Sequence, residues 1–140
     1  MYRILMPVDD DEGRARSQAR FVAGLPGAAE DLEVRVLFVF SDEGEDLPAE
    51  LSRFKSADRI ASVRRAVERL EEATVDVEVA EESGKPARTI LHEAEDYGAD
   101  LIVLGGRKRS PVGKAIFGSV AQTVILESER PVAVTGSTEE

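Results

Sequence analysis

The sequence predicts an α/β fold, a doubly wound, five-stranded parallel sheet of strand order 3-2-1-4-5 flanked by four helices. Short apolar runs rich in β-branched residues alternate with stretches in which apolar residues recur every three or four positions. The first and fourth of these runs are apolar almost throughout, which is typical of strands in the middle of a sheet. The third run alternates with polar residues, which indicates an edge strand.

The first half of the chain is predicted to contain two strands and two helices. Tyr2–Val8 is an apolar run interrupted only by Arg3, and it predicts the first strand. Three acids precede a helix that ends at Pro26, and Val34–Phe40 is the second strand. After an acidic loop, the longest helix spans roughly Ala49–Ala73. The apolar faces of these helices are Ala15, Ala19, Val22 and Leu25, and then Ile60, Val63, Val67 and Leu70.

The second half is predicted to contain three strands and two helices. Val75–Val79 is the alternating third strand, Pro86 lies in the first turn of the third helix, and Gly98 ends that helix. The inner face of the third helix is Ala87, Ile90, Leu91 and Ala94. The last elements are a strand at Leu101–Leu104, a helix beginning near Ser119, and a strand at Pro131–Thr135.

Composition limits the possible functions. With 140 residues, of which 42% are hydrophobic and 33% charged, we expect one globular domain over residues 1–140. The absence of Cys excludes thiolate chemistry, and a single His, His92, excludes a His-rich metal cluster. No apolar run reaches membrane-spanning length, and no signal-peptide pattern opens the chain, so we expect a cytoplasmic protein.

The net charge of -10 bears on partners and habitat. The 28 acids outnumber the 18 bases, and such a surface repels nucleic acid and anionic membranes, so neither is an expected partner. An acidic surface poor in Lys also suits a cytoplasm of high salt, in which self-repulsion is screened. A halophilic habitat is therefore one hypothesis, and an ordinary acidic protein is the other.

Two segments converge in the predicted sheet. The strand order reverses between the first and fourth strands, so a crevice should open where Pro7-Val8-Asp9 and the loop after Gly105 meet. That loop takes about thirteen residues to reach Ser119, whereas such connections usually take about two to six. Glycine amides, cations and a helix N-terminus together favour a bound phosphate, although Gly105 could also serve only as an exit turn. The cations of the loop are Arg107, Lys108, Arg109 and Lys114.

Each of these residues also has a structural explanation. Asp9 is suited to accept a hydrogen bond from a ribose hydroxyl or an adenine amino group, but it could equally cap the first helix, as could Asp10 and Asp11. The three acids could also hold Mg²⁺ if phosphates completed its coordination. Ser119 and Gln122 form an S-x-x-Q capping box that accounts for the serine without any ligand.

Other phosphate-binding motifs fit poorly. Gly113-Lys114 lacks the preceding glycine of a Walker A loop, and Ala115 follows where Ser or Thr is required. Acids after the first strand replace the glycines of a dinucleotide fingerprint. The same acids would repel the phosphate of FMN, and with 5% aromatic residues few rings could sandwich a flavin, so an FMN carrier is disfavoured.

The chain resembles the universal stress protein family over essentially its whole length. The resemblance rests on Ile4–Asp9, Ala99–Gly105, Gly118-Ser119-Val120-Ala121 and Arg130–Val134. ATP-binding members of that family carry glycine, two residues, glycine, nine residues, then glycine and Ser or Thr. Gly105, Gly118 and Ser119 match this pattern, whereas Lys108 occupies the position of the middle glycine.

The resemblance implies an adenine nucleotide alpha hydrolase-like fold and an ATP site, with Mg²⁺ as a possible companion. The implied nucleotide-binding residues are Pro7, Val8, Asp9, Val39, Leu104, Gly105, Arg107, Lys108, Gly118, Ser119, Val120 and Ala121. It also implies a homodimer formed through Pro131–Thr135.

Two functions compete within this family. The first is a stress-related module that binds ATP and hydrolyses it slowly at most, because no general base is positioned by a motif and no catalytic residue is assigned. The alternative is a dimeric interaction scaffold that binds no nucleotide, and Lys108 is the feature that favours it.

Overall fold

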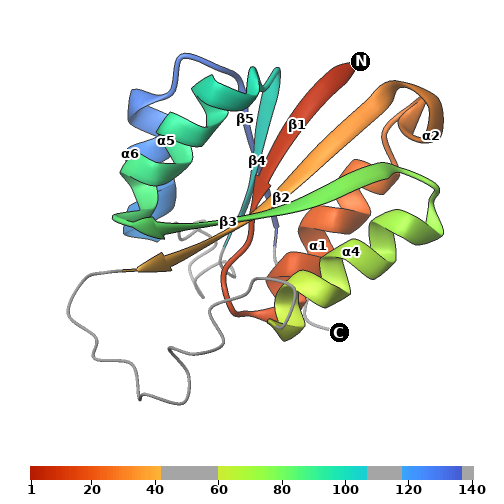
Figure 1. Ribbon diagram of the computed structural model, residues 1–140, viewed down its shortest axis with the longest axis horizontal. Helices are drawn as coiled ribbons and strands as arrows, with labels where there is room; N and C mark the ends of the chain where they lie inside the picture. The colour runs from red at the N-terminus through yellow and green to blue at the C-terminus, as the bar shows by residue number, and fades with distance from the viewer. Residues whose placement is uncertain (42–59, 107–117, 137–140) are drawn as a thin grey trace, which may run out of the picture.

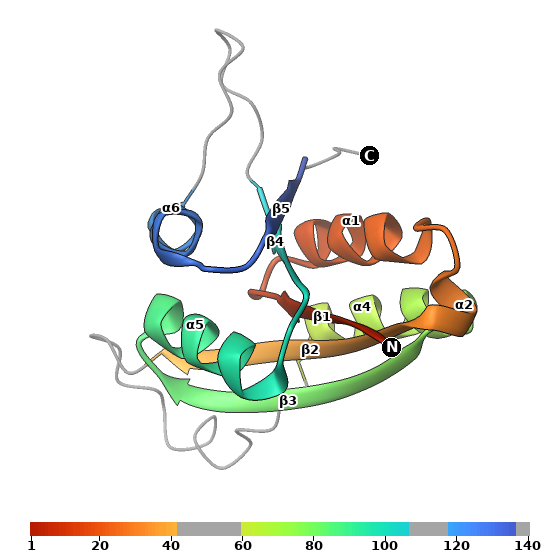
Figure 2. The ribbon, with the colours of Figure 1, turned by 90° about the horizontal axis from the view of Figure 1, so that it is seen from above.

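The computed structural model describes residues 1–41, 60–106 and 118–136 and confirms the predicted sheet. Five parallel strands are arranged in the order β3-β2-β1-β4-β5. Figure 2 shows β3 and β5 at the two opposite edges of the twisted sheet. The strands are β1 (Tyr2–Pro7), β2 (Leu32–Ser41), β3 (Asp76–Gly84), β4 (Leu101–Gly105) and β5 (Val132–Thr135).

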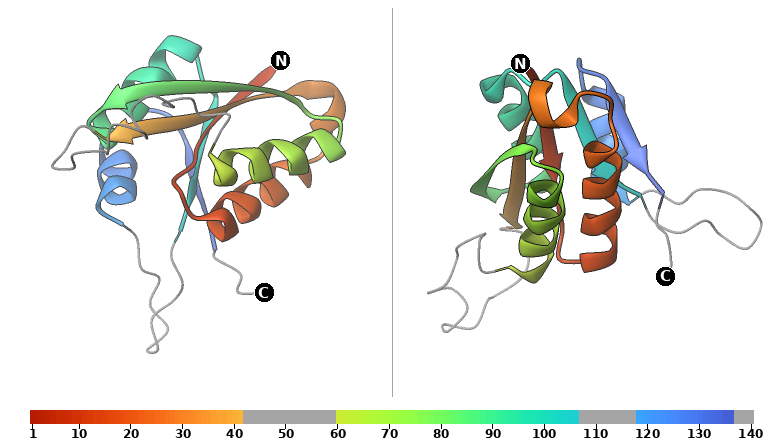
Figure 3. Two further views of the ribbon diagram at one scale, coloured as in Figure 1. Left: turned by 60° about the horizontal axis from the view of Figure 1, so that its bottom comes forward. Right: turned by 90° about the vertical axis from the view of Figure 1, so that its right-hand side faces the viewer.

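Helices cover both faces of the sheet. Two of them, α1 (Glu12–Ala23) and α4 (Ala61–Glu72), lie side by side on one face (Figures 1 and 3). On the other face lie α5 (Pro86–Tyr97) and α6 (Ser119–Glu127) (Figure 1). The long helix predicted at Ala49–Ala73 is thus found as α4, and its positions 49–59 lie outside the described residues.

A short helix, α2 (Ala28–Asp31), was not predicted. Its four residues follow Gly27, which has a left-handed backbone with φ of 73° and allows the chain to turn after α1. One helical turn is too short to show an apolar periodicity, so no sequence pattern marks it. Its Ala28 is buried against the core on the α1 side.

The core consists of two layers, one on each side of the sheet. Ile4 and Met6 of β1 belong to the layer under α1 and α4, whereas Leu5 belongs to the layer under α5 and α6, and all three are fully buried. Ile102 and Val103 of β4 divide between the two layers in the same way. Burial on both faces therefore places β1 and β4 in the middle of the sheet, as predicted.

The two edge strands differ in charge. β3 carries four exposed acids, Asp76, Glu78, Glu81 and Glu82, and extends to Gly84, five residues beyond the predicted end at Val79. Asp76 and Glu78 fit the alternating pattern, whereas Glu81 and Glu82 break it, which explains why the predicted strand ends too early. The half-buried β5 carries no charged residue at all. One edge of the sheet is thus strongly acidic and the other is neutral.

A polar cluster closes the amino end of the sheet under α5. The buried ring of Tyr97 lies between the guanidinium groups of Arg3 and Arg35, whose Cζ atoms are 5.5 and 4.2 Å from the ring centroid. Arg35 also pairs with Glu78 at 2.7 Å and with Glu93 at 3.2 Å, which ties β2 to β3 and to α5. This cluster accounts for the buried position of Glu93.

Within the three described ranges, no helix combines the length and the apolar character needed to cross a bilayer.

Candidate functional site

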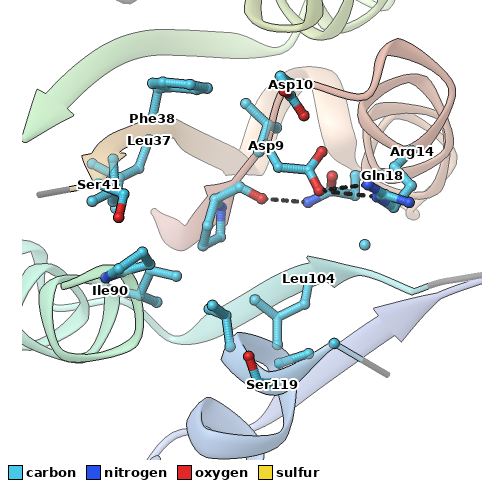
Figure 4. A pocket seen from close by; sticks show the side chains of 18 of the residues that line it. Asp9, Asp10, Arg14, Gln18, Leu37, Phe38, Ser41, Ile90, Leu104 and Ser119 are labelled. Carbon is cyan, nitrogen blue, oxygen red and sulfur yellow. Dashed lines mark hydrogen bonds and ion pairs between the residues drawn. The ribbon is translucent and has the colours of Figure 1, made fainter. Parts of the chain in front are cut away.

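The candidate site opens where β1 and β4 separate. The two strands pair only at Ile4 with Leu101 and at Leu5 with Ile102. Beyond these pairs a cavity of about 460 Å³ lies at the carboxyl ends of the strands, within the size range of small-molecule sites (Figure 4). It occupies the crevice predicted at the reversal of the strand order.

Pro7 ends the β1–β4 ladder. Val8 N–H donates to Leu37 O of β2 at 2.9 Å, and because successive peptide groups of a strand face opposite neighbours, the main chain of Pro7 faces β4. In the register of the earlier pairs, an N–H at position 7 would donate to Val103 O. Proline has no N–H, so that bond cannot form.

The side chain of Gln18 replaces the missing bonds. Its Nε2 donates to Pro7 O at 2.6 Å and to Val103 O at 3.1 Å, so one amide from α1 joins both strands where they part. Gln18 is 1% exposed. A buried polar group of this kind is stable only when its hydrogen bonds are made, and these two bonds fix the width of the crevice.

Asp9 follows β1 and lies at the rim of the cavity, where it is engaged with Arg14. Its Oδ1 accepts from Asp11 N–H at 3.0 Å, and its Oδ2 lies 3.0 Å from Arg14 Nε and 2.9 Å from Arg14 Nη2. Asp11 is the N-cap of α1, with its side chain accepting from Arg14 N–H at 2.8 Å. Of the three acids considered as caps, Asp11 therefore performs that role.

The first turn of α6 forms the opposite side of the cavity, with Ser119 facing the crevice across from Asp9 (Figure 4). The N-cap of α6 is Gly118 rather than Ser119, and no described side chain caps this end. The predicted capping box is therefore wrong, because Ser119 is already the first helical residue and is one position too late to cap. The unpaired amides of a first helical turn attract anions.

Apolar side chains form the remaining wall. Leu37 and Val39 of β2, Ile90 of α5 and Leu104 of β4 line the cavity, and all four belong to or pack on the core layer beneath α5 and α6. This wall provides a surface on which a flat apolar group can pack.

Ten of the predicted site residues line this one cavity. They are Pro7, Val8, Asp9, Val39, Leu104, Gly105, Gly118, Ser119, Val120 and Ala121. The other two, Arg107 and Lys108, lie outside the described residues, as do Arg109 and Lys114 of the same loop.

Arg14 and Gln18 also line the cavity and were missed by the sequence analysis. Gln18 lies on the predicted apolar face of the first helix, between Ala15 and Ala19. A polar residue at such a core position needs hydrogen-bond partners, and this signal could have identified it from the sequence. Nothing in the sequence indicates that Arg14 lines a cavity, because arginines are common on the exposed faces of helices. Gly105 is explained by the same helix, since a Cβ there would lie 2.9 Å from Gln18 Oε1.

Within residues 1–41, 60–106 and 118–136, no three His, Asp or Glu side chains come together in a way that could hold a metal ion. The described carboxylates of Asp9 and Asp11 pair with Arg14 instead.

Sequence comparison identifies relatives of this chain. The family model described as the universal stress protein family matches residues 1–136. A universal stress protein of Mycolicibacterium smegmatis is 42% identical over 64 residues, which are 45% of this chain and 49% of that protein. The chain thus matches about half the length of this curated relative.

Solved structures agree with the sequence match. A universal stress protein from Archaeoglobus fulgidus superposes with a TM-score of 0.71 at 31% identity, over 96% of this chain and 98% of that one. A universal stress protein from the same organism in complex with dAMP, at 23% identity, has the same fold, with a TM-score of 0.71 over 96% and 98% of the two chains. On the match of residues 1–136 above all, the chain belongs to the universal stress protein family.

Proposed function

We propose that this protein binds an adenine nucleotide, ATP in the first place, in the cavity between β1 and β4, and that it acts as a binding module in a stress response. The observation that carries the proposal is the first turn of α6, which no described side chain caps and which faces Asp9 across a cavity with apolar walls. Such a site offers one region for anions and another for a flat ring.

The described residues fit the three parts of a nucleotide. The apolar wall of Leu37, Val39 and Ile90 suits the base, and the amides of the first turn of α6 suit a phosphate. The exposed carboxylate of Asp9 has lone pairs left to accept a bond from a ribose hydroxyl. The complex of an Archaeoglobus fulgidus relative with dAMP supports an adenine ligand.

Slow hydrolysis at most is expected. Asp9 and Asp10 are the carboxylates among the described cavity residues, and Asp9 already accepts bonds from Asp11 and Arg14. A carboxylate held in this way is a poor general base, because its ionised form is stabilised. Phosphate release from ATP, measured with and without Mg²⁺, should therefore stay close to the uncatalysed rate, and rapid turnover would contradict a binding role.

The nucleotide proposal is tested by calorimetry with ATP, AMP and adenosine, together with mass spectrometry of small molecules released from the denatured protein. The informative variant is Gly118→Val. Gly118 has φ of -70° and ψ of 167°, which any residue adopts, so the fold should survive while the added side chain blocks the phosphate region.

Gly136→Val is the matched control, because a Cβ at Gly136 meets nothing within 4 Å. Binding that is lost in Gly118→Val and kept in Gly136→Val supports the proposal. Unchanged ATP affinity in Gly118→Val, or no binding of any adenine compound by the unmodified protein, would refute it.

We also propose a homodimer in which two β5 strands, with the preceding Pro131, pair antiparallel about a two-fold axis. β5 is an edge strand with one row of backbone groups free of a sheet partner, and such rows are usually covered. The acids of β3 would oppose a second copy at the other edge by like-charge repulsion.

Replacing both Val132 and Val134 by Lys should give monomers by light scattering at micromolar concentration and high salt. Val79→Lys on the β3 edge, where Val79 is 39% exposed, is the control and should leave the dimer intact. A monomeric unmodified protein would rule out this contact.

A further inference from the structure

Arg14 occupies an electrostatically unfavourable position in α1. It is the third residue of a helix capped by Asp11, and a cation in the first turn lies at the positive end of the helix dipole. Gln18, one turn later, is explained by the two strands that it bridges. Among the described residues Arg14 pairs with Asp9 and Asp11, which offsets this cost, and its side chain also lines the cavity, where a ligand can reach it.

The guanidinium of Arg14 is held in a fixed orientation. Asp9 Oδ2 lies within 3.0 Å of both Nε and Nη2, and Asp9 is itself held by the bond from Asp11 N–H. The Arg14 side chain is only 23% exposed, and Nη1 is 3.8 Å from Asp11 Oδ2, beyond hydrogen-bond distance. With Nε and Nη2 held by Asp9, Nη1 of the oriented guanidinium can donate a hydrogen bond to a ligand.

Arg14 and the first turn of α6 line the same cavity. A Cβ on Gly105 would be 3.4 Å from Arg14 Cβ, so the arginine stem packs over the end of β4. Figure 4 shows Arg14 beside Asp9 on one side of the cavity and Ser119 on the other. In a chain of net charge -10, with Asp9 and Asp10 in the same cavity, a local cation also reduces the repulsion of an anionic ligand.

We propose that Arg14 is a phosphate-contacting residue, positioned by Asp9, that makes the site select phosphorylated nucleotides over nucleosides. The inference rests on the proposed function and adds a specificity determinant to it. It assigns to α1 a part of phosphate recognition that the sequence motifs place entirely in the loop and helix after β4.

The test compares the affinities of AMP and adenosine for the full chain and its Arg14→Gln variant. The variant should bind AMP roughly 10- to 100-fold more weakly, the usual effect of losing a charge-assisted hydrogen bond, with adenosine affinity changed less than about 3-fold. Arg16→Gln, on the exposed face of the same helix, is the control for the loss of one positive charge and should change neither affinity.

The outcomes separate three situations. A selective loss of AMP affinity supports the proposal. An equal loss for AMP and adenosine assigns Arg14 a purely structural role and overturns it, as does an unchanged AMP affinity. If the unmodified protein binds neither compound, the proposed function itself fails. Should Arg14→Gln not fold, Arg14→Lys serves instead, and a ratio of AMP to adenosine affinity equal to that of the unmodified protein would overturn the proposal.

Discussion

Replacing Gln18 by Leu tests how the crevice is held open. The two residues are similar in volume, but Leu has no donor, so Pro7 O and Val103 O lose the bonds that Gln18 Nε2 now supplies at 2.6 and 3.1 Å. Because Gln18 is 1% exposed, water cannot replace the amide without rearrangement. The substitution should therefore destabilise the fold and disturb the ligand site together.

The size of the effect follows from the two lost bonds. Each buried carbonyl left without its donor costs about 1–3 kcal/mol, and greater burial of apolar surface by Leu recovers about 1 kcal/mol. For the two carbonyls together, the net loss in free energy of unfolding is about 1–5 kcal/mol. With an unfolding entropy of about 2.1 cal/mol/K per residue, a chain of 140 residues should melt roughly 3–17 °C lower.

Urea and thermal unfolding of Gln18→Leu measure this loss, and calorimetry with ATP reports on the cavity. Gln122→Leu makes the same chemical change at an exposed position of α6 and should have little effect on stability. Adding Pro7→Ala to Gln18→Leu should restore part of the stability, because position 7 then offers an N–H to Val103 O. A melting temperature for Gln18→Leu within about 2 °C of the unmodified protein would refute the bridging role.

Three further predictions concern stability. The Tyr97 hydroxyl is buried with no hydrogen-bond partner among the described residues, so Tyr97→Phe should raise the free energy of unfolding by about 1–2 kcal/mol. Burial also raises the pKa of Tyr97 from 10.0 to about 12, so the free energy of unfolding is independent of this group below pH 10 and falls as the pH rises from 10 towards 12. Urea titrations from pH 8 to 11 should show this loss in the unmodified protein and not in Tyr97→Phe, and parallel curves would contradict it. Gly106→Ala should lower the melting temperature, because its Cβ would lie 2.7 Å from Thr135 O, whereas Gly136→Ala should not, and equal melting temperatures would count against the close approach. Thermal unfolding should shift upwards as KCl rises from millimolar to molar concentrations, because salt screens a net charge of -10, and indifference to salt would remove the argument for a saline habitat.

The sequence predicts the sheet well because the burial of each strand can be seen in the order of apolar and polar residues along the chain. Apolar residues on both faces distinguish β1 and β4 from the alternating start of β3, and strand order follows from that contrast. The end of β3 was missed because an edge strand has no inner positions that demand apolar residues, so the acids up to Glu82 read as a loop. A helix as short as α2 has too few residues to repeat any pattern.

The site was predicted where it depends on strand ends and not where it depends on a neighbouring helix. Asp9 and Gly105 follow directly from the reversal of strand order. The contacts of Gln18 join residues 11 and 85 positions away, and no local pattern encodes such distances. The start of α6 near Ser119 was predicted, but the cap was assigned one residue too late, because Ser119 is a good cap by composition although the extended backbone at the helix boundary belongs to Gly118.

The unequal charge of the two sheet edges limits how far copies of this chain can add to one another. A sheet open on both sides could in principle continue from molecule to molecule into a filament. The carboxylates along β3 oppose that growth at one end, so the proposed association through the neutral β5 edge would close after two copies. If the proposed dimer forms, the acids of β3 would stop further assembly, and replacing them by neutral residues should produce long, sedimentable particles at concentrations where the unmodified protein stays in solution.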